Sequence, residues 1–467
     1  FMPGCEILQS FDLVHWEHVT YVYETLDHTD AQQLKSGQNI YGQGMWAASL
    51  RYHEGRFYIC FVANDTRKTY LYTSEKIDGP WKKQLIEGFY HDGSLLFDED
   101  GRNYIVYGND EIWITELNED LTAPKKDGLH RLLVSDHKNP ELGYEGSHIQ
   151  KINGYYYIFL IHSLRDRWMR TEACFYSDSL EGEFTGGDVL CDDRGYCGQG
   201  VAQGGIVDTP DGKWYAMLFQ DSGAVGRLPI LLPVTWKDHF PFFGQNGHVP
   251  EEIEVHSTRP GYIYQPLVGS DDFCNGLLPR WQFNHDPDPR YYHLDALQGT
   301  YTITTREVCT ELTQAVNTLT QRMSYPSCAA EVTVDASALK EGDVAGLCAL
   351  QSCYAAVGIT KHHGKYEVLM LDKKEDGILD MTEGTVVESH QMDFRLEADF
   401  CNMKDEARCY YRVNKGDWLP IGTVHKLYFK LDHFTGCRFG LFCYAAEETG
   451  GSACFRDFKY YDVDEIS

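Results

Sequence analysis

The sequence predicts an all-β protein of two domains, a five-bladed β-propeller at residues 1–260 and a jelly-roll-like β-sandwich at residues 270–467. Three observations support this prediction. Helical periodicity is nearly absent, a turn-and-strand pattern repeats through the first half, and the second half is a series of short β-type runs broken by turns. A chain of 467 residues also exceeds what one hydrophobic core usually organises.

The repeat consists of an acidic or amide residue, a glycine and an aromatic strand. Such dipeptides adopt the backbone angles that tight hairpin turns need. The four copies are residues 54–58 (EGRFY), 100–104 (DGRNY), 153–157 (NGYYY) and 211–215 (DGKWY). Successive glycines are 46, 53 and 58 residues apart, which is about the length of one four-stranded propeller blade with its loops.

A second element, a turn followed by an aromatic residue, closes some of these units. It occurs at residues 77–81 (IDGPW) and 180–184 (LEGEF), and residues 12–16 (DLVHW) match it without a preceding hairpin. We therefore expect residues 12–16 to belong to the second half of a blade whose first half lies upstream of Phe1. Four hairpins and this orphaned element together predict five blades.

Beyond residue 270 the repeat is replaced by isolated strand-like runs, such as residues 330–334 (AEVTV) and 438–442 (RFGLF). Short strands separated by turns are typical of a β-sandwich. We therefore expect a second, separate β domain.

Charge and cysteine content restrict the classes of partner. The 70 acidic and 41 basic residues give a net charge of -29, which disfavours nucleic acid and anionic membranes as partners. The 15 cysteines are dispersed and show no CxxC pair, a pattern that favours a reducing compartment. No apolar run is long enough to span a membrane. We expect a cytoplasmic bacterial protein, with self-association left open.

Two acidic residues open strands at equivalent positions in successive repeats. Asp92 lies in residues 90–94 (YHDGS), and Glu145 lies in residues 143–148 (GYEGSH). Inner strands of a propeller begin around its central channel, so these carboxyls can face one another. Glycoside hydrolysis needs such groups, one to protonate the leaving oxygen and another to activate water. An ordinary turn remains the alternative for both sites, because an acidic residue before glycine is common in turns.

Several motifs follow one another in a fixed order along the chain. They are residues 3–4 (PG) with 12–16 (DLVHW), 46–58 (WAASLRYHEGRFY), 92–94 (DGS), 145–148 (EGSH), 203–205 (QGG), 226–227 (GR), 270–273 (SDDF), 281–285 (WQFNH) and 433–436 (HFTG). In this order they resemble glycoside hydrolase family 43, the five-bladed propeller β-xylosidases and α-L-arabinofuranosidases, and the β-sandwich that accompanies one branch of it. Ala48, Gly93 and Ser147 replace the family's usual proline, and none of these changes removes a functional group.

The resemblance implies a role for the two acidic residues and two of their neighbours. Glu145 would be the general acid, and Asp92 would be the helper carboxylate that orients it and keeps it protonated. Trp46 would stack on the apolar face of the sugar, although core packing would explain it equally well. Arg227 would contact sugar hydroxyls or a carboxylate, with a solvated loop charge as the alternative.

The resemblance also implies further parts of a substrate pocket. Gln203 and Phe434 would contact the substrate, with Phe434 reaching over from the sandwich to close the pocket. The general base would be an aspartate in the first inner strand, which places it upstream of Phe1. The family acts by inversion, in which water attacks one face of the sugar while the acid protonates the other side.

We therefore expect an exo-acting inverting glycosidase that releases terminal xylose or arabinose from short xylo- or arabino-oligosaccharides. β-Xylosidase and α-L-arabinofuranosidase remain alternatives, because the two terminal sugars can present equivalent groups to one pocket. A non-catalytic sugar-binding propeller that lacks its general base is the alternative from another class. No cofactor is expected to be required and no metal-ligand set is evident, but a structural or channel calcium ion is compatible with the sequence.

Overall fold

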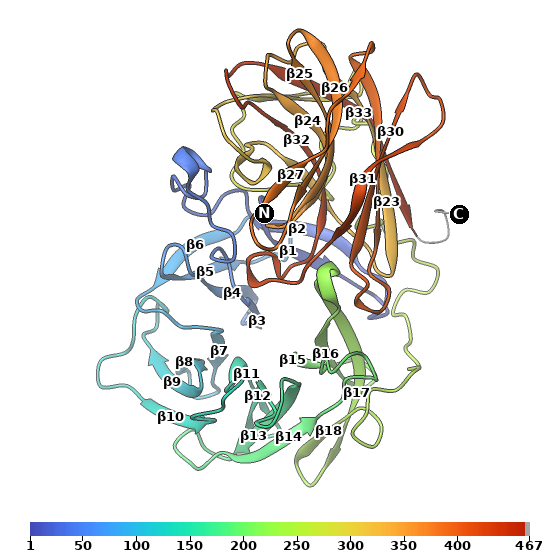
Figure 1. Ribbon diagram of the computed structural model, residues 1–467. Coiled ribbons are helices and arrows are strands. Elements are labelled where there is room, and N and C mark those ends of the chain that lie inside the picture. Colours follow the sequence, from blue (N-terminus) through green and yellow to red (C-terminus); the bar gives the residue numbers. More distant parts are fainter. Residues whose placement is uncertain (463–467) are drawn as a thin grey trace.

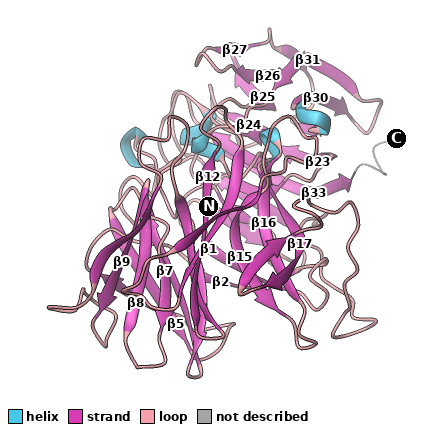
Figure 2. Cartoon of the chain, turned by 90° about the horizontal axis from the view of Figure 1, so that it is seen from below, coloured by secondary structure: helices cyan, strands magenta, loops and turns pink. Residues whose placement is uncertain are grey.

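The computed structural model describes residues 1–462, which form 33 β-strands and five single-turn 3₁₀ helices. In Figure 1 the strands up to Phe243 are arranged in a ring of sheets, and those from Gln282 onward form a sandwich packed above it. The predicted all-β fold class, a propeller followed by a β-sandwich, is therefore confirmed. Figure 2 shows from below how strands dominate both domains and how few helical turns there are. No helix among the described residues is long and apolar enough to cross a membrane.

The ring contains four antiparallel sheets of four strands each, with strands in sequence order from the inside outward. The first blade consists of β3 (Ser49–His53), β4 (Arg56–Ala63), β5 (Lys68–Ser74) and β6 (Lys82–Ile86). The second blade consists of β7 (Ser94–Phe97), β8 (Asn103–Asn109), β9 (Glu111–Leu117) and β10 (His130–Ser135). The third blade consists of β11 (Glu145–Ile152), β12 (Tyr155–Ser163), β13 (Arg170–Ser177) and β14 (Thr185–Leu190). The fourth blade is β15 (Ala202–Asp208), β16 (Trp214–Asp221), β17 (Arg227–Lys237) and β18 (Phe240–Phe243).

The repeated dipeptides form the first hairpin of each blade, as predicted. In the third blade, Asn153 (φ 51°) and Gly154 (φ 86°) both adopt positive φ, the conformation that a two-residue hairpin turn with the right twist requires. Each hairpin returns the chain from the inner strand to the second strand. The residue that precedes each inner strand therefore lies on the same face of the ring in every blade.

The two strands at the N-terminus, β1 (Gly4–Gln9) and β2 (Glu17–Tyr23), pair only with each other. Residues 12–16 lie between them, where Asp12 Oδ1 accepts the N–H groups of Val14 and His15. The prediction of five blades is not confirmed, because the described residues form four complete blades and this two-stranded sheet. In the first blade, residues 77–81 lie between the outer strands β5 and β6, so this turn-and-aromatic element marks an outer strand pair, whereas the hairpin dipeptide marks the inner pair.

The sandwich consists of an eight-stranded and a seven-stranded sheet. The first holds β19 (Gln282–Phe283), β22 (Leu319–Arg322), β32 (Arg438–Tyr444), β24 (Val344–Leu350), β25 (Ala355–His362), β26 (Lys365–Lys373), β27 (Leu379–Met381) and β28 (Thr385–Val387). The second holds β20 (Tyr292–Asp295), β21 (Thr300–Thr304), β33 (Ser452–Asp462), β23 (Ser327–Asp335), β29 (Gln391–Asp399), β30 (Glu406–Val413) and β31 (Leu419–Lys426). The 3₁₀ turns are η1 (Lys35–Gly37), η2 (Gly223–Val225), η3 (Leu312–Gln314), η4 (Cys401–Met403) and η5 (Leu431–His433).

The central strand β24 shows why the sandwich sequence lacks simple alternation. Every residue of β24 is buried. Ala345 and Leu347 point into the core between the two sheets, and Cys348 and Leu350 belong to a second cluster on the other side. A strand covered on both faces is a continuous apolar run.

Glycines allow the two domains to meet next to the ring's inner face. A Cβ on Gly226 would lie 2.7 Å from the backbone nitrogen of Gly436, so neither of these two segments leaves room for a side chain on the other. The Cys437 N–H donates to Ala224 O at 2.8 Å, and the Ala224 N–H donates to Asp405 Oδ1 at 3.1 Å. These bonds hold the loop after η5 against the start of β17.

Candidate active site

The structure brings Asp92 and Glu145 together at the starts of two neighbouring inner strands. Asp92 precedes β7 and has a positive φ of 48°, and Glu145 is the first residue of β11. The Gly146 N–H donates to Asp92 Oδ2 at 3.0 Å, so one carboxylate is bonded to the backbone that carries the other. Ser147 Oγ adds contacts to the carbonyl oxygens of Asp92 at 2.7 Å and Val106 at 2.9 Å.

The two carboxyl groups have unequal environments. Asp92 is 6% exposed, and its Oδ1 has no hydrogen-bond partner among the described residues. Burial, with the nearby charge of Glu145, raises the pKa of Asp92 to about 6. The Glu145 side chain is 20% exposed. One carboxyl is therefore enclosed and the other is accessible.

Two polar side chains that the sequence analysis did not identify contact Glu145. Asn109 Nδ2, at the end of β8, donates to Glu145 Oε2 at 2.9 Å. His91 Nε2 lies 3.4 Å from the same oxygen and 3.7 Å from Asp92 Oδ2. The position of His91, directly before Asp92, was the available signal. Ligand atoms of His91, Asp92 and Glu145 lie within 4.8 Å of one another, close enough to hold a cation, but Glu145 Oε2 already accepts two hydrogen bonds.

Gln203 lies against the buried carboxyl. Its backbone N–H donates to Glu172 Oε2 at 2.7 Å, and its Nε2 lies 3.5 Å from Asp92 Oδ2. Burial raises the pKa of Glu172 well above its ordinary value, and its carboxyl group anchors this bend. A Cβ on Gly146 would lie 2.7 Å from the Gln203 side chain. Gln203 therefore contacts both the Asp92 carboxyl group and the backbone beside Glu145.

Arg227 shares an acidic partner with a second arginine. Its Nε lies 3.3 Å from Asp221 Oδ1, and Arg170 is ion-paired with the other oxygen of Asp221. The Phe219 ring centroid is 4.4 Å from the Arg227 guanidinium carbon and 5.4 Å from that of Arg170. Burial lowers the pKa of Arg227, while the charges of Glu145 and Asp92 oppose that shift. Arg170 and Arg227 therefore place two guanidinium groups near Glu145. Of these two arginines, the sequence analysis identified only Arg227.

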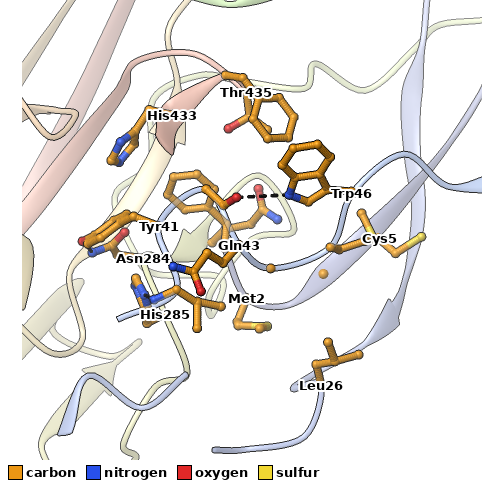
Figure 3. A pocket seen from close by; sticks show the side chains of 18 of the residues that line it. Met2, Cys5, Leu26, Tyr41, Gln43, Trp46, Asn284, His285, His433 and Thr435 are labelled. Atoms are coloured by element: carbon orange, nitrogen blue, oxygen red, sulfur yellow. Dashed lines mark hydrogen bonds between the residues drawn. The ribbon is translucent and has the colours of Figure 1, made fainter. Parts of the chain in front are cut away.

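Phe434 connects Arg227 with Trp46. Its ring centroid is 4.9 Å from the Arg227 guanidinium carbon and 6.1 Å from the Trp46 ring, in an edge-to-face arrangement. The Trp46 ring is 5.7 Å from His91, and its Nε1–H donates to Gly42 O at 3.1 Å. Figure 3 shows Trp46 close to Thr435, with His433 further along the same sandwich loop. All six residues singled out in the sequence thus belong to one connected region.

A pocket between the two domains adjoins this region. Trp46 and Phe434 line it together with residues of both domains, among them Tyr41, Asn284 and His433 (Figure 3). The Tyr41 ring is 4.9 Å from the His433 ring, and Asn284 Nδ2 donates to the Tyr41 hydroxyl at 2.5 Å. The sandwich therefore forms part of the wall around Trp46.

Arg51 occupies the inner side of the first three blades. Its guanidinium group donates to Leu95 O at 3.0 Å and to Ile149 O at 2.9 Å, and it also bonds the Ser94 hydroxyl. Inner-strand carbonyl oxygens of β7 and β11 therefore already have a positively charged partner.

A pair of carboxyl groups at the starts of neighbouring inner strands, one enclosed and one accessible, is an arrangement that glycoside hydrolysis can use. Comparison with known proteins gives the family. Residues 1–241 match the family described as Glycosyl hydrolases family 43, and residues 270–461 match the Beta xylosidase C-terminal Concanavalin A-like domain. The chain belongs to glycosyl hydrolase family 43.

Similar proteins agree over nearly the whole length. A β-xylosidase of Formosa agariphila is 25% identical over 99% of this chain and 84% of its own length. A non-reducing end α-L-arabinofuranosidase of Bacteroides ovatus is 22% identical over 82% of this chain and 74% of its own length. Among solved structures, a bifunctional GH43-CE protein of Bacteroides eggerthii is 41% identical, with a TM-score of 0.91 over all of this chain. The chain spans 60% of that protein's length.

Proposed function

We propose that this family 43 glycosidase removes terminal xylose or arabinofuranose units from short plant-derived oligosaccharides with inversion of configuration. The observation that carries the proposal is the pairing of the enclosed Asp92 with the accessible Glu145. A general acid must reach the leaving oxygen, whereas a helper carboxylate acts through its charge and needs no access. Relatives named as β-xylosidase and as α-L-arabinofuranosidase support both terminal sugars.

The surrounding groups support an exo-acting site. Trp46 offers an aromatic face to the sugar, and Arg227 offers guanidinium donors next to both carboxyls. Phe434, held by the sandwich loop, lies against both and limits the pocket on one side. A pocket bounded in this way admits the end of a chain more readily than its middle.

The catalytic base and the fifth blade remain predictions. Two other acids near the pair are poor candidates for the base, because Asp221 is ion-paired with two arginines and Glu172 is fully buried and accepts the Gln203 backbone N–H. The exposed apolar side chains of Leu50 and Tyr52 on β3 and Val207 on β15 support a further pair of inner strands between the first and fourth blades. β1 and β2 would be the outer strands of that fifth blade.

Two further proposals concern the cellular compartment in which the enzyme works and a bound calcium ion. All fifteen cysteines are free in the described residues, which supports work in a reducing compartment such as the cytoplasm. A calcium ion in the channel also stays a prediction, and the Arg51 guanidinium already supplies a positive charge to carbonyl oxygens there.

The decisive experiment follows products directly. The protein is incubated with xylobiose and with an arabinofuranosyl-substituted xylo-oligosaccharide, and proton NMR follows the anomeric signals of the released sugar. We expect one terminal pentose per cleavage, released first as the anomer opposite to that of the substrate. Release of the same anomer would contradict inversion, and binding of xylose without any release would favour the non-catalytic alternative. If the base lies outside residues 1–467, this chain alone should bind xylose but hydrolyse xylobiose very slowly.

A further inference from the structure

The two oxygens of the Glu145 carboxyl group are not equivalent. Oε2 accepts a hydrogen bond from Asn109 Nδ2 at 2.9 Å and lies 3.4 Å from His91 Nε2. No side chain or backbone group among residues 1–462 makes a hydrogen bond to Oε1. One oxygen is therefore a double acceptor, and the other is left for a group that enters the site.

The surroundings of His91 fix which ring nitrogen carries a proton. Nε2 lies between Glu145 Oε2 and Asp92 Oδ2, and two carboxyl oxygens favour an N–H between them. The Gly108 N–H donates to His91 O at 3.0 Å, which fixes the backbone of His91, and the Trp46 ring centroid is 5.7 Å from that of the imidazole. His91 is therefore an Nε2–H donor.

We propose that His91, with Asn109, is a positioning residue that keeps the transferable proton of the general acid Glu145 on Oε1. The proposal rests on the proposed function, which makes Glu145 the acid. An oxygen that accepts two hydrogen bonds is a poor site for a proton, since the proton would face two donors. Oε1 is free of such donors and can present its proton to the leaving oxygen.

His91 and Asp92 act on the ionisation of Glu145 in opposite directions. A donor on Oε2 stabilises the ionised carboxylate, whereas the negative charge of Asp92 disfavours it. The other charged groups that act at the site are Arg170 and Arg227 near Glu145 and Arg67 near His91, from β13, β17 and the turn before β5.

The charge state of His91 adds to this balance. Burial lowers the pKa of His91, but the hydrogen bond with Glu145 and the charges of Asp92 and Glu145 outweigh burial and raise it above its ordinary value. His91 therefore keeps its positive charge to higher pH than an isolated histidine. The charged ring favours ionised Glu145 more strongly than the neutral ring does.

The test compares His91→Leu with His18→Leu across the pH–rate profile for xylobiose. His18 is a matched control, because its side chain is 19% exposed and pairs with Glu6, while that of His91 is 18% exposed and pairs with Glu145. We expect His91→Leu to lower kcat roughly tenfold, the effect of losing one charge-assisted hydrogen bond. It should also move the alkaline limb to higher pH, opposite to Asp92→Asn. His91→Gln, which can donate an amide N–H, should restore much of the rate.

A second measurement does not depend on turnover. In ¹⁵N-histidine spectra, the signal lost in His91→Leu should belong to a ring with a proton on Nε2. A ring protonated on Nδ1 alone would overturn the inference, and so would an alkaline limb that stays in place while the rate falls. If the unaltered enzyme releases no pentose, the proposed function fails, whereas the spectrum separately tests whether His91 is the Nε2–H donor to Glu145 Oε2.

Discussion

The second and third blades each carry a carboxyl group at the start of the inner strand, but one group is enclosed and the other is accessible. Asp92 and Glu145 each stand at the start of an inner strand, next to a glycine. Asp92 bonds the backbone of the next blade and is nearly enclosed, while Glu145 has side-chain partners on one oxygen only. A repeat can therefore supply equivalent positions, but the neighbouring blade decides whether a carboxyl becomes an internal charge or an accessible acid.

The largest effect should come from removing the accessible carboxyl. Glu145→Gln keeps the shape of the side chain but cannot donate a carboxylic proton, so hydrolysis of xylobiose should fall roughly 10²–10⁴-fold. An aryl glycoside whose phenol leaves readily needs less protonation and should lose much less. The ratio of kcat values for the two substrates measures this difference, and equal losses would show that Glu145 is not the acid.

Removing the enclosed carboxyl should change pH dependence and stability together. Asp92→Asn removes a negative charge beside Glu145, so the acid ionises earlier and the alkaline limb moves to lower pH. The pKa of Asp92 is raised to about 6 in the folded protein, so ionising it costs stability as pH rises from about 4 to 6. The variant avoids this cost and should gain about 3 kcal/mol above pH 6, using about 1.4 kcal/mol per pKa unit.

Thermal unfolding at pH 4 and at pH 7.5 checks the second half of that expectation. At pH 4 the aspartic acid and the asparagine are both largely neutral, so the two proteins should differ little. A variant that is less stable than the unaltered protein at pH 7.5 would mean that the folded protein stabilises the Asp92 carboxylate, contrary to the raised pKa of this group.

A smaller effect is expected at the sandwich loop. Phe434→Ala removes the ring between Trp46 and Arg227, and an aromatic contact of this kind contributes about 1 kcal/mol, or roughly fivefold in kcat/KM. Phe242→Ala is a suitable control, because Phe242 lies half-exposed on the outer strand β18. Equal kcat/KM in both variants would argue against a role for the sandwich in substrate binding.

The sequence repeat predicts the positions of residues within a blade, but it does not predict which side chains meet between blades. The hairpin dipeptides set the phase of each blade, so the shared position of Asp92 and Glu145 follows from local turn geometry. His91 and Asn109 become partners of Glu145 only through the packing of one blade on another, which no local pattern describes. Asp221, on the neighbouring strand β16, likewise pairs with Arg227 of β17 and with Arg170 of the third blade. The placement of Phe434 beside Trp46 and Arg227 could be predicted only through resemblance, because a separate domain brings it there.

The smallest predicted effect concerns the link between the two blades themselves. Ser147 Oγ lies within hydrogen-bond distance of Asp92 O and Val106 O, in a fully enclosed position. Ser147→Ala leaves these carbonyl oxygens without that donor, which should cost about 1 kcal/mol of stability and lower the melting temperature by a few degrees at most. Activity should change little, because the Gly146 N–H still holds the Asp92 side chain. Ser135→Ala, at an exposed serine of β10 whose hydroxyl accepts the His137 N–H at 3.1 Å, should lower the melting temperature less, because water can replace that bond. If Ser147→Ala instead lowered kcat strongly at unchanged stability, the hydroxyl would be setting the distance between the two carboxyls, and the difference between them would depend on this serine as well as on burial.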